Sequence, residues 1–287
     1  MTSHEPRQRR RTLISLLVAV LGVALGLGGL ALLHPFAAGS PSPVADRAAS
    51  PEARALPRPL SDAAIRARIE PSVVDVEATL THDETASGTG FVTDARTGLI
   101  LTNNHVIRDA TSVTVTVPAT GRTYRAGIVG VDVGADIAVL KISPAAGLIA
   151  APLGDSATVA VGAPVISFGN QAGAGGSPAV ARGVITATDR TIQADDGVAG
   201  FSETLHGMLA TTARIEPGDS GGPLAGAAGT VIGVDTAAGA GGAKTGYAIP
   251  IDTAMAAERQ ITARHPGHGI SLGVDGTTGT TSSRPAR

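Results

Sequence analysis

Apolar and polar residues alternate along several short runs between residues 72 and 250, which is the pattern of half-buried β-strands. The clearest run is "SVTVTV" at 112–117, where every second side chain is valine. We expect strands over 72–79, 98–102, 112–117, 124–132, 137–142, 163–169, 179–188, 207–212, 230–235 and 245–250. A single helix is expected at 252–264, with Asp252 as its N-cap. Many short strands with one C-terminal helix predict an all-β fold, either a barrel or a sandwich.

The N-terminal part of the chain breaks this pattern. Residues 1–12 form a basic segment with four arginines, and the 21 residues that follow, 13–33, carry no charge. A helix of this length reaches about 31 Å, the thickness of the hydrocarbon core of a bilayer. Arginines before the span predict a cytoplasmic N-terminus and an exported remainder, so we expect a single-pass transmembrane signal anchor. The alternative is a cleaved signal peptide with a cut near "FAAGS", followed by secretion.

Composition sets limits on the rest of the chain. Residues 34–60 are rich in proline and alanine and predict a linker, 61–265 predict one folded domain, and 266–287 predict a disordered tail. Charged residues make up 16% of the chain and the net charge is −2, so nothing indicates nucleic-acid binding. The sequence has no cysteine, which excludes disulfides and thiolate chemistry. We expect no metal and no cofactor.

The run "GDSGGPL" at 218–224 places glycines on both sides of Ser220. Such a run indicates a backbone that approaches something closely or adopts an uncommon conformation. A serine hydroxyl is a poor nucleophile until a base accepts its proton, and that base needs a third group to orient it. Ser220 is therefore a candidate nucleophile whose partners must come from elsewhere in the chain.

His105 is the candidate base. The other six histidines lie beside the membrane span, by the tail, in a polar loop or at a strand edge, at positions 4, 34, 82, 206, 265 and 268. His105 follows an expected strand and a polar turn, "GLILTNNHVIRDA", so its ring can face a cleft. Asp136 begins an otherwise apolar strand, where a charge is unfavourable unless it is hydrogen-bonded, and it is the candidate acid. Asp132 and Asp155 lie in turns, where capping is the simpler interpretation.

Four motifs resemble those of the HtrA-type bacterial serine proteases. They are "SGTGFVTDARTGLILTNNHVI", "DIAVLKI", "GDSGGPL" and "GTVIGVDTAAGAGGAKTGYAIP". The stretch that runs from "GNQAGAGGSP" through "QADDGVAGFSETLHGMLATTARIEPGDSGGPL" resembles the secreted PepA-type members more closely. The chain order His105, Asp136, Ser220 is also that of chymotrypsin-like proteases. The resemblance covers about 65–253. It implies a chymotrypsin-like double β-barrel of six strands each, with His105 and Asp136 from the first barrel and Ser220 from the second.

The resemblance also implies roles for residues around the serine. The N–H groups of Gly218 and Ser220 would form the oxyanion hole. The substrate-binding residues would be Arg214, Ile215, Val234, Asp235, Thr236 and Ala237. An apolar pocket of this kind selects Val, Ala or Leu at P1, whereas an inward Arg214 would select acidic residues. We favour an outward Arg214 that pairs with Glu216, because a buried unpaired charge is unfavourable.

Two departures from the HtrA pattern affect the expected organisation. Only "ISLGVDG" follows the helix where relatives continue into a PDZ domain, so we expect no PDZ domain. The segment "SDAAIRARIE" lacks the aromatic residues with which family trimers pack, which favours a monomer over a trimer. We therefore expect a serine endopeptidase anchored in a bacterial cell membrane, outside the cytoplasm, that hydrolyses misfolded or cell-envelope proteins through an acyl-enzyme. The alternative is a catalytically silent protease-fold chaperone or scaffold that binds unfolded chains.

Overall fold

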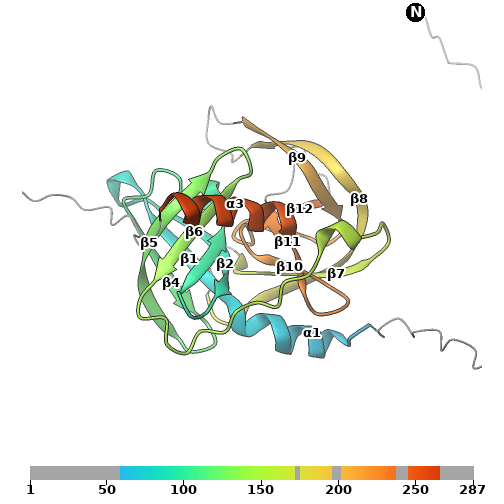
Figure 1. Ribbon diagram of the computed structural model, residues 1–287, viewed down its shortest axis with the longest axis horizontal. Coiled ribbons are helices and arrows are strands. Elements are labelled where there is room, and N and C mark those ends of the chain that lie inside the picture. The colour runs from blue at the N-terminus through green and yellow to red at the C-terminus, as the bar shows by residue number, and fades with distance from the viewer. Residues whose placement is uncertain (1–58, 172–174, 196–201, 237–244, 266–287) are drawn as a thin grey trace, which may run out of the picture. The chain divides into compact units, whose positions relative to one another are not determined.

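The computed structural model describes residues 59–171, 175–195, 202–236 and 245–265 (Figure 1). Twelve antiparallel strands in these ranges form two closed barrels of six strands each. In the first barrel the spatial order is β1-β2-β3-β6-β5-β4, closed by the pairing of β1 with β4. In the second it is β10-β11-β12-β9-β8-β7, closed by the pairing of β10 with β7. The structure therefore confirms the all-β double barrel with a C-terminal helix.

Each barrel takes its six strands from one continuous part of the chain. The first barrel contains β1 (Val73–Thr79), β2 (Thr85–Asp94), β3 (Leu99–Thr102), β4 (Ser112–Val117), β5 (Arg122–Asp132) and β6 (Ile137–Ile142). The second contains β7 (Pro164–Gly169), β8 (Ala179–Asp195), β9 (Ser202–Thr211), β10 (Pro223–Gly226), β11 (Val231–Thr236) and β12 (Gly246–Pro250). The helices are α1 (Asp62–Ile69), α2 (Asn104–Ile107) and α3 (Ile251–Arg264), with 3₁₀ turns at Glu70–Ser72, Thr81–Asp83 and Ser156–Thr158.

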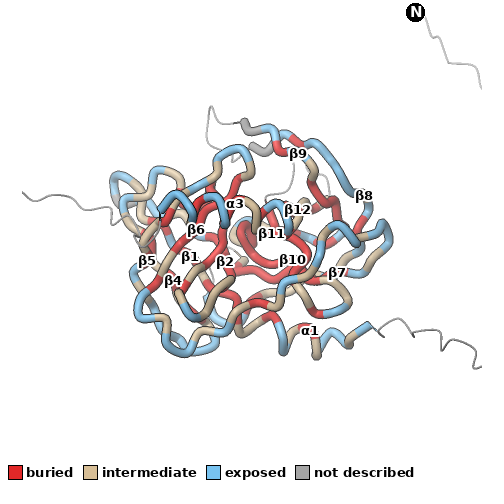
Figure 2. The backbone as a smooth tube through the Cα atoms, in the orientation of Figure 1, coloured by how far each residue is buried: buried red, intermediate tan, exposed pale blue. Residues whose placement is uncertain are grey.

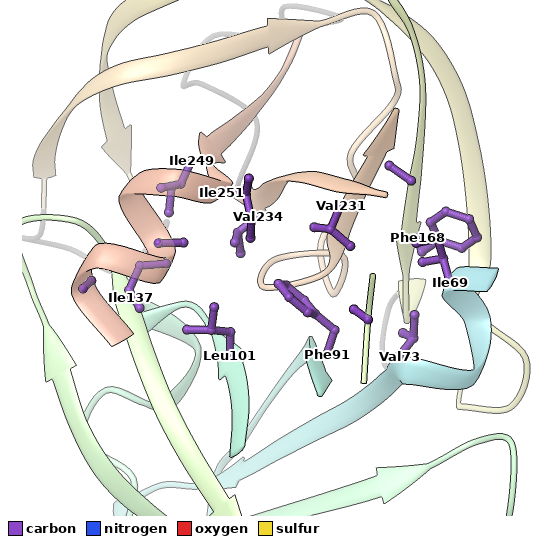
Figure 3. Close-up of a cluster of buried hydrophobic side chains, with 14 of the residues drawn as sticks. Ile69, Val73, Phe91, Leu101, Ile137, Phe168, Val231, Val234, Ile249 and Ile251 are labelled. Carbon is purple, nitrogen blue, oxygen red and sulfur yellow. The ribbon is translucent and has the colours of Figure 1, made fainter. Parts of the chain in front are cut away.

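A cluster of buried apolar side chains joins the two barrels. Figure 3 shows Phe91 and Leu101 of the first barrel facing Val231 and Val234 of the second. Helix α3 packs against β5 and β6 as well as β11 and β12, and it adds Ile251 to the cluster (Figure 1). Figure 2 shows the buried backbone concentrated in the middle of this part of the chain, with exposed residues along its rims. This shared core holds the two barrels in one fixed arrangement, because close-packed interiors resist displacement.

Four local expectations differ from the structure. Strands β2 and β10 were not expected: β2 contains glycines and threonines in place of a clear alternation, and β10 is four residues long and begins with proline. Helix α1, capped by the Ser61 hydroxyl, was not expected either. Helix α3 begins one residue early, at Ile251, with Pro250 at the N-cap, so the prediction of Asp252 as its N-cap was wrong. The Asp252 carboxylate instead accepts hydrogen bonds from the backbone N–H and hydroxyl of Ser156.

The membrane span expected at 13–33, most of the linker and the tail at 266–287 lie outside the described residues. Within the described ranges, no helix combines the length and the apolar character needed to cross a membrane.

Candidate active site

His105 lies in the single turn of helix α2, directly after strand β3 of the first barrel. Its side chain keeps 20% of its surface exposed. The sequence predicted this arrangement of strand, polar turn and helical turn. At the end of a buried strand the backbone of a histidine is held in place while its ring stays accessible, which suits proton transfer.

Asp136 lies in the turn between β5 and β6 and adopts a left-handed conformation with φ of 52°. Aspartate tolerates this region better than most residues. Its side chain is buried, with 2% of its surface exposed. Its Oδ2 atom lies 2.8 Å from His105 Nδ1, and its Oδ1 atom accepts the backbone N–H of His105 at 3.0 Å. The carboxylate therefore fixes both the ring and the backbone of His105.

The backbone of Asp136 is held as firmly as its side chain. Its carbonyl oxygen accepts the Asn103 side-chain amide at 2.9 Å and the Asn104 N–H at 3.2 Å. The two asparagines before His105 thus tie the β3–α2 turn to the β5–β6 turn. By contrast, the carboxylates of Asp132 and Asp155 accept local backbone N–H groups, as capping predicts.

Thr236, the last residue of β11, makes a contact that the sequence did not indicate. Its hydroxyl donates to Asp136 Oδ2 at 3.1 Å, and the side chain is fully buried. The bond crosses from the second barrel to the first. Thr236 was expected to bind substrate, whereas in the structure its side chain supports the carboxylate that orients His105.

Ser220 lies in a tightly bonded segment of the second barrel, residues 216–222, which we call the nucleophile turn. Pro217 and Gly218 occupy its centre, Gly218 has φ of 96°, and the Asp219 N–H donates to the Glu216 carbonyl at 2.9 Å. This is the pattern of a type II turn, which requires a residue with positive φ after the proline. Gly221 donates its N–H to the Asp235 carbonyl at 2.8 Å, which fixes the turn on strand β11.

Two backbone N–H groups of the nucleophile turn have no acceptor in the part of the chain that the structure describes. Neither Gly218 N–H nor Ser220 N–H donates a hydrogen bond to any residue in the described ranges. The Ser220 hydroxyl likewise makes no hydrogen bond within these ranges, although the residue is nearly buried, with 6% of its surface exposed. Backbone donors in a folded interior are normally paired, so two N–H groups that lie beside a serine and have no acceptor among the described residues are available to a ligand.

The other expected substrate-binding residues lie in different surroundings. Arg214 is 85% exposed at its side chain and forms an ion pair with Glu216, so its guanidinium lies on the surface. Ile215 is buried and packs against Gly246 of β12. Val234 belongs to the core between the barrels, and Asp235 is fully buried, so neither side chain faces solvent. Ala237 lies outside the described residues.

Two buried carboxyl groups lie close to Ser220 in the fold. Burial raises the pKa of Asp235 well above its usual range, even though the Ser167 hydroxyl donates to it at 2.6 Å. Burial also raises the pKa of Asp219, whose Oδ2 accepts the Glu216 N–H at 2.9 Å. Neither group is hydrogen-bonded to His105, so Asp136 is its acidic partner. No group of three or more metal-ligating side chains occurs among the described residues.

The sequence and the fold both match known proteins. A family model described as "Trypsin-like peptidase domain" matches residues 88–234. Serine protease PepD of Mycobacterium tuberculosis is 32% identical over 300 residues, covering 96% of this chain and 63% of that protein. Serine protease Do-like HtrB of Bacillus subtilis is 36% identical over 200 residues, covering 63% of this chain and 43% of the relative.

Solved structures agree with these relatives. The HtrA-type protease AlgW with tripeptide superposes with a TM-score of 0.61 at 33% identity, over 71% of this chain and 64% of that one. A serine endoprotease from Yersinia pestis gives 0.60 at 31% identity, over 71% and 68%. The chain spans less than two thirds of the length of PepD and HtrB. Because the fold, the order of the motifs and the relatives agree, the chain is a member of the trypsin-like peptidase family and of its HtrA-type group.

Proposed function

We propose that this chain is a serine endopeptidase in which Ser220 is the nucleophile, His105 is the general base and acid, and Asp136 orients His105. The observation that carries the proposal is the 2.8 Å hydrogen bond between His105 Nδ1 and the buried Asp136 carboxylate. Acyl transfer by serine requires an oriented imidazole of this kind. Membership of the trypsin-like peptidase family supports the same interpretation.

The hydrogen bond between His105 and Asp136 supports one direction of proton transfer. Because Asp136 Oδ2 is an acceptor, His105 Nδ1 carries the proton and Nε2 keeps its lone pair. Nε2 takes the Ser220 proton as Oγ bonds to the carbonyl carbon of the scissile peptide. The same proton passes to the leaving nitrogen as the C–N bond breaks, which leaves an acyl group on Ser220. A water molecule then repeats both steps with His105 as base and releases the new carboxyl terminus.

The free N–H groups of Gly218 and Ser220 would stabilise the oxyanion that forms on the attacked carbonyl. They are the backbone donors that the nucleophile turn leaves without acceptors among the described residues. Donors that are already oriented need no reorganisation when charge develops, and removal of one such donor costs about 10²–10³ in rate.

Peptide hydrolysis by active-site variants tests the proposal. We expect Ser220→Ala and His105→Ala each to reduce casein hydrolysis by about 10⁶, and the double variant to be no worse, because these residues act as a unit. Ser61→Ala, which removes an exposed serine hydroxyl at the start of α1, is the matched control and should cleave at the wild-type rate. Wild-type cleavage by Ser220→Ala would overturn the mechanism, and a wild-type chain that binds casein without cutting it would favour a chaperone.

We also propose that the substrate pocket is shallow and apolar and selects Val, Ala or Leu at P1. The surface ion pair of Arg214 with Glu216 supports this, because that guanidinium is exposed and already paired with a carboxylate. A fitting methylene contributes only about 1–3 kcal/mol, so selectivity should be broad. Profiling on a proteome-derived peptide library checks it. Dominant Asp or Glu at P1, reversed by Arg214→Ala, would contradict the aliphatic pocket.

For its location, we propose that residues 13–33 anchor the chain in a bacterial cell membrane as a monomer, with the peptidase domain outside the cytoplasm. There it would act on misfolded or cell-envelope proteins. The uncharged run behind four arginines supports this placement. The full-length chain should sediment with membranes and resist carbonate extraction. Mature chains in the medium that begin near Gly39 or Ser40 would instead indicate a cleaved signal peptide.

A further inference from the structure

Thr89 is a fully buried polar residue in β2 of the first barrel, and its hydrogen bonds lead mainly to the second barrel. Its backbone N–H donates to the Ser220 carbonyl at 2.8 Å. Its hydroxyl donates to the Gly218 carbonyl at 2.6 Å and accepts the Asn170 N–H at 2.8 Å. The fourth bond, from the Thr102 hydroxyl to the Thr89 carbonyl at 2.7 Å, stays within the first barrel. One side chain therefore connects strand β2 to the nucleophile turn and to the end of β7.

The position of this connection matters because the reacting groups come from different barrels. His105 lies on the first barrel and Ser220 on the second, and no hydrogen bond joins their side chains. Their separation therefore depends on contacts that cross between the barrels near the site. The Thr236–Asp136 bond is one such contact, and Thr89 provides three more.

The side chain of Thr89 adds something that the backbone cannot. Any residue at this position offers its N–H to the Ser220 carbonyl. Only a small hydroxyl side chain can also donate to the Gly218 carbonyl while accepting the Asn170 N–H. Gly218 and Ser220 are the two residues whose N–H groups would bind the oxyanion. Thr89 binds the carbonyl oxygen of each of them, that of Gly218 through its hydroxyl and that of Ser220 through its backbone N–H.

We propose that Thr89 is a positioning residue: its hydroxyl holds the Gly218–Ser220 segment in register with His105, so that the nucleophile and the two oxyanion donors meet the scissile carbonyl together. The proposal rests on the proposed peptidase function and deepens it. Thr89 does not touch the substrate and acts through Gly218 and Ser220. A displacement of about 1 Å at reacting groups can reduce a rate by about 10²-fold, so a short bond to this segment has a measurable consequence.

The test compares Thr89→Val with Thr89→Ser in the full-length chain. Valine keeps the shape of threonine and removes the hydroxyl, whereas serine keeps the hydroxyl. For a fluorogenic peptide built from the best-cleaved library sequence, we expect Thr89→Val to lower kcat by about 10–100-fold with KM within threefold, since only transition-state contacts are lost. Thr89→Ser should remain within about threefold of the wild-type kcat, because it keeps both bonds of the hydroxyl.

A matched control separates positioning from general loss of stability. The Ser72 hydroxyl is also fully buried and donates to a carbonyl, that of Ile69, at 2.6 Å, and this bond involves no residue of the nucleophile turn. Ser72→Ala should lower the melting temperature and leave kcat within twofold of wild type. If Thr89→Val does not fold, Thr89→Cys replaces it, because a thiol of similar size donates only weakly.

The outcomes are distinct. A loss in kcat by the valine or cysteine variant, with rescue by serine and an unaffected Ser72→Ala, supports the proposal. A wild-type kcat without the hydroxyl, a loss confined to KM, a failure of serine to rescue, or an equal loss in Ser72→Ala would overturn it. Residual wild-type activity in Ser220→Ala would overturn the peptidase mechanism itself, independently of Thr89.

Discussion

Replacement of Gly221 by alanine should destabilise the fold, because two separate penalties meet at this position. Gly221 has φ of 87°, and an L-residue held in the left-handed region costs about 1–2 kcal/mol. Its new Cβ would also overlap the Thr89 carbonyl oxygen and the Thr102 hydroxyl, and lie 3.1 Å from the Asn103 nitrogen. Relief of such overpacking costs about 1–3 kcal/mol more. Together these give about 2–5 kcal/mol, a large part of a typical stability of about 5–15 kcal/mol.

Gly121 offers a matched control for the backbone part of this effect. It lies in the turn between β4 and β5 with φ of 67°, and a Cβ there would have no atom within 4 Å. Gly121→Ala should therefore lose only the conformational part, about 1–2 kcal/mol. The difference between the two variants isolates the close approach of the nucleophile turn to strand β2.

Urea unfolding of the wild-type chain and both variants measures the two free energies. We expect Gly221→Ala to be less stable than Gly121→Ala by about 1–3 kcal/mol at an unchanged m-value. Gly221→Ala should also lose peptidase activity, since the overlap pushes Ser220 away from the first barrel, whereas Gly121→Ala should keep it. Equal stability of the two variants would refute the close packing from which the loss is calculated.

Two further predictions concern polar groups. Burial raises the pKa of Asp75 from 3.8 to about 6, so the folded protein favours the neutral carboxyl and ionisation opposes folding. The stability that the neutral carboxyl allows is fully present below about pH 4 and is lost as the pH rises through about 6. Asp75→Asn should therefore raise the melting temperature at pH 7 but not at pH 3.5. Glu77→Gln, at an exposed position of β1, is the control and should leave the melting temperature unchanged at both pH values. An Asp75→Asn variant with the wild-type melting temperature at pH 7 would contradict this prediction. Thr236→Val removes the hydroxyl that donates to Asp136. It should lower kcat/KM about tenfold, since a hydrogen bond to a charged group contributes about 1.5–3 kcal/mol. Unchanged steady-state kinetics would exclude a role of Thr236 in supporting Asp136.

The sequence predicted the fold class because most strands carry a local signal. Strand β4 alternates buried and half-buried residues, as its valines and threonines predict. Strand β2 gave no such signal, because glycines and threonines fill the half that faces the nucleophile turn. Its identity as a strand depends on pairing with β1 and β3, which are contacts that local periodicity does not encode. Helix α1 did have a signal in Ser61 followed by Asp62, which the linker-like composition before it obscured.

The candidate site shows the same division between local and long-range information. Ser220, His105 and Asp136 stood out because each is a reactive residue in an unusual local context. Thr236 did not, since a threonine at the end of a strand is ordinary until the opposite barrel brings a buried carboxylate to it. The family resemblance implied substrate-binding roles for Val234 and Asp235, and the local sequence gave no sign that both side chains are buried.

Covalent labelling distinguishes a Ser220 that His105 activates from an ordinary serine. The full-length chain would be treated with a fluorophosphonate, digested, and mapped by mass spectrometry, alongside Ser220→Ala and His105→Ala. We expect a single adduct on Ser220, none in Ser220→Ala, and much slower labelling in His105→Ala, because the reagent reacts with a serine activated by an oriented base. An adduct on another serine, or labelling at the wild-type rate without His105, would contradict this expectation.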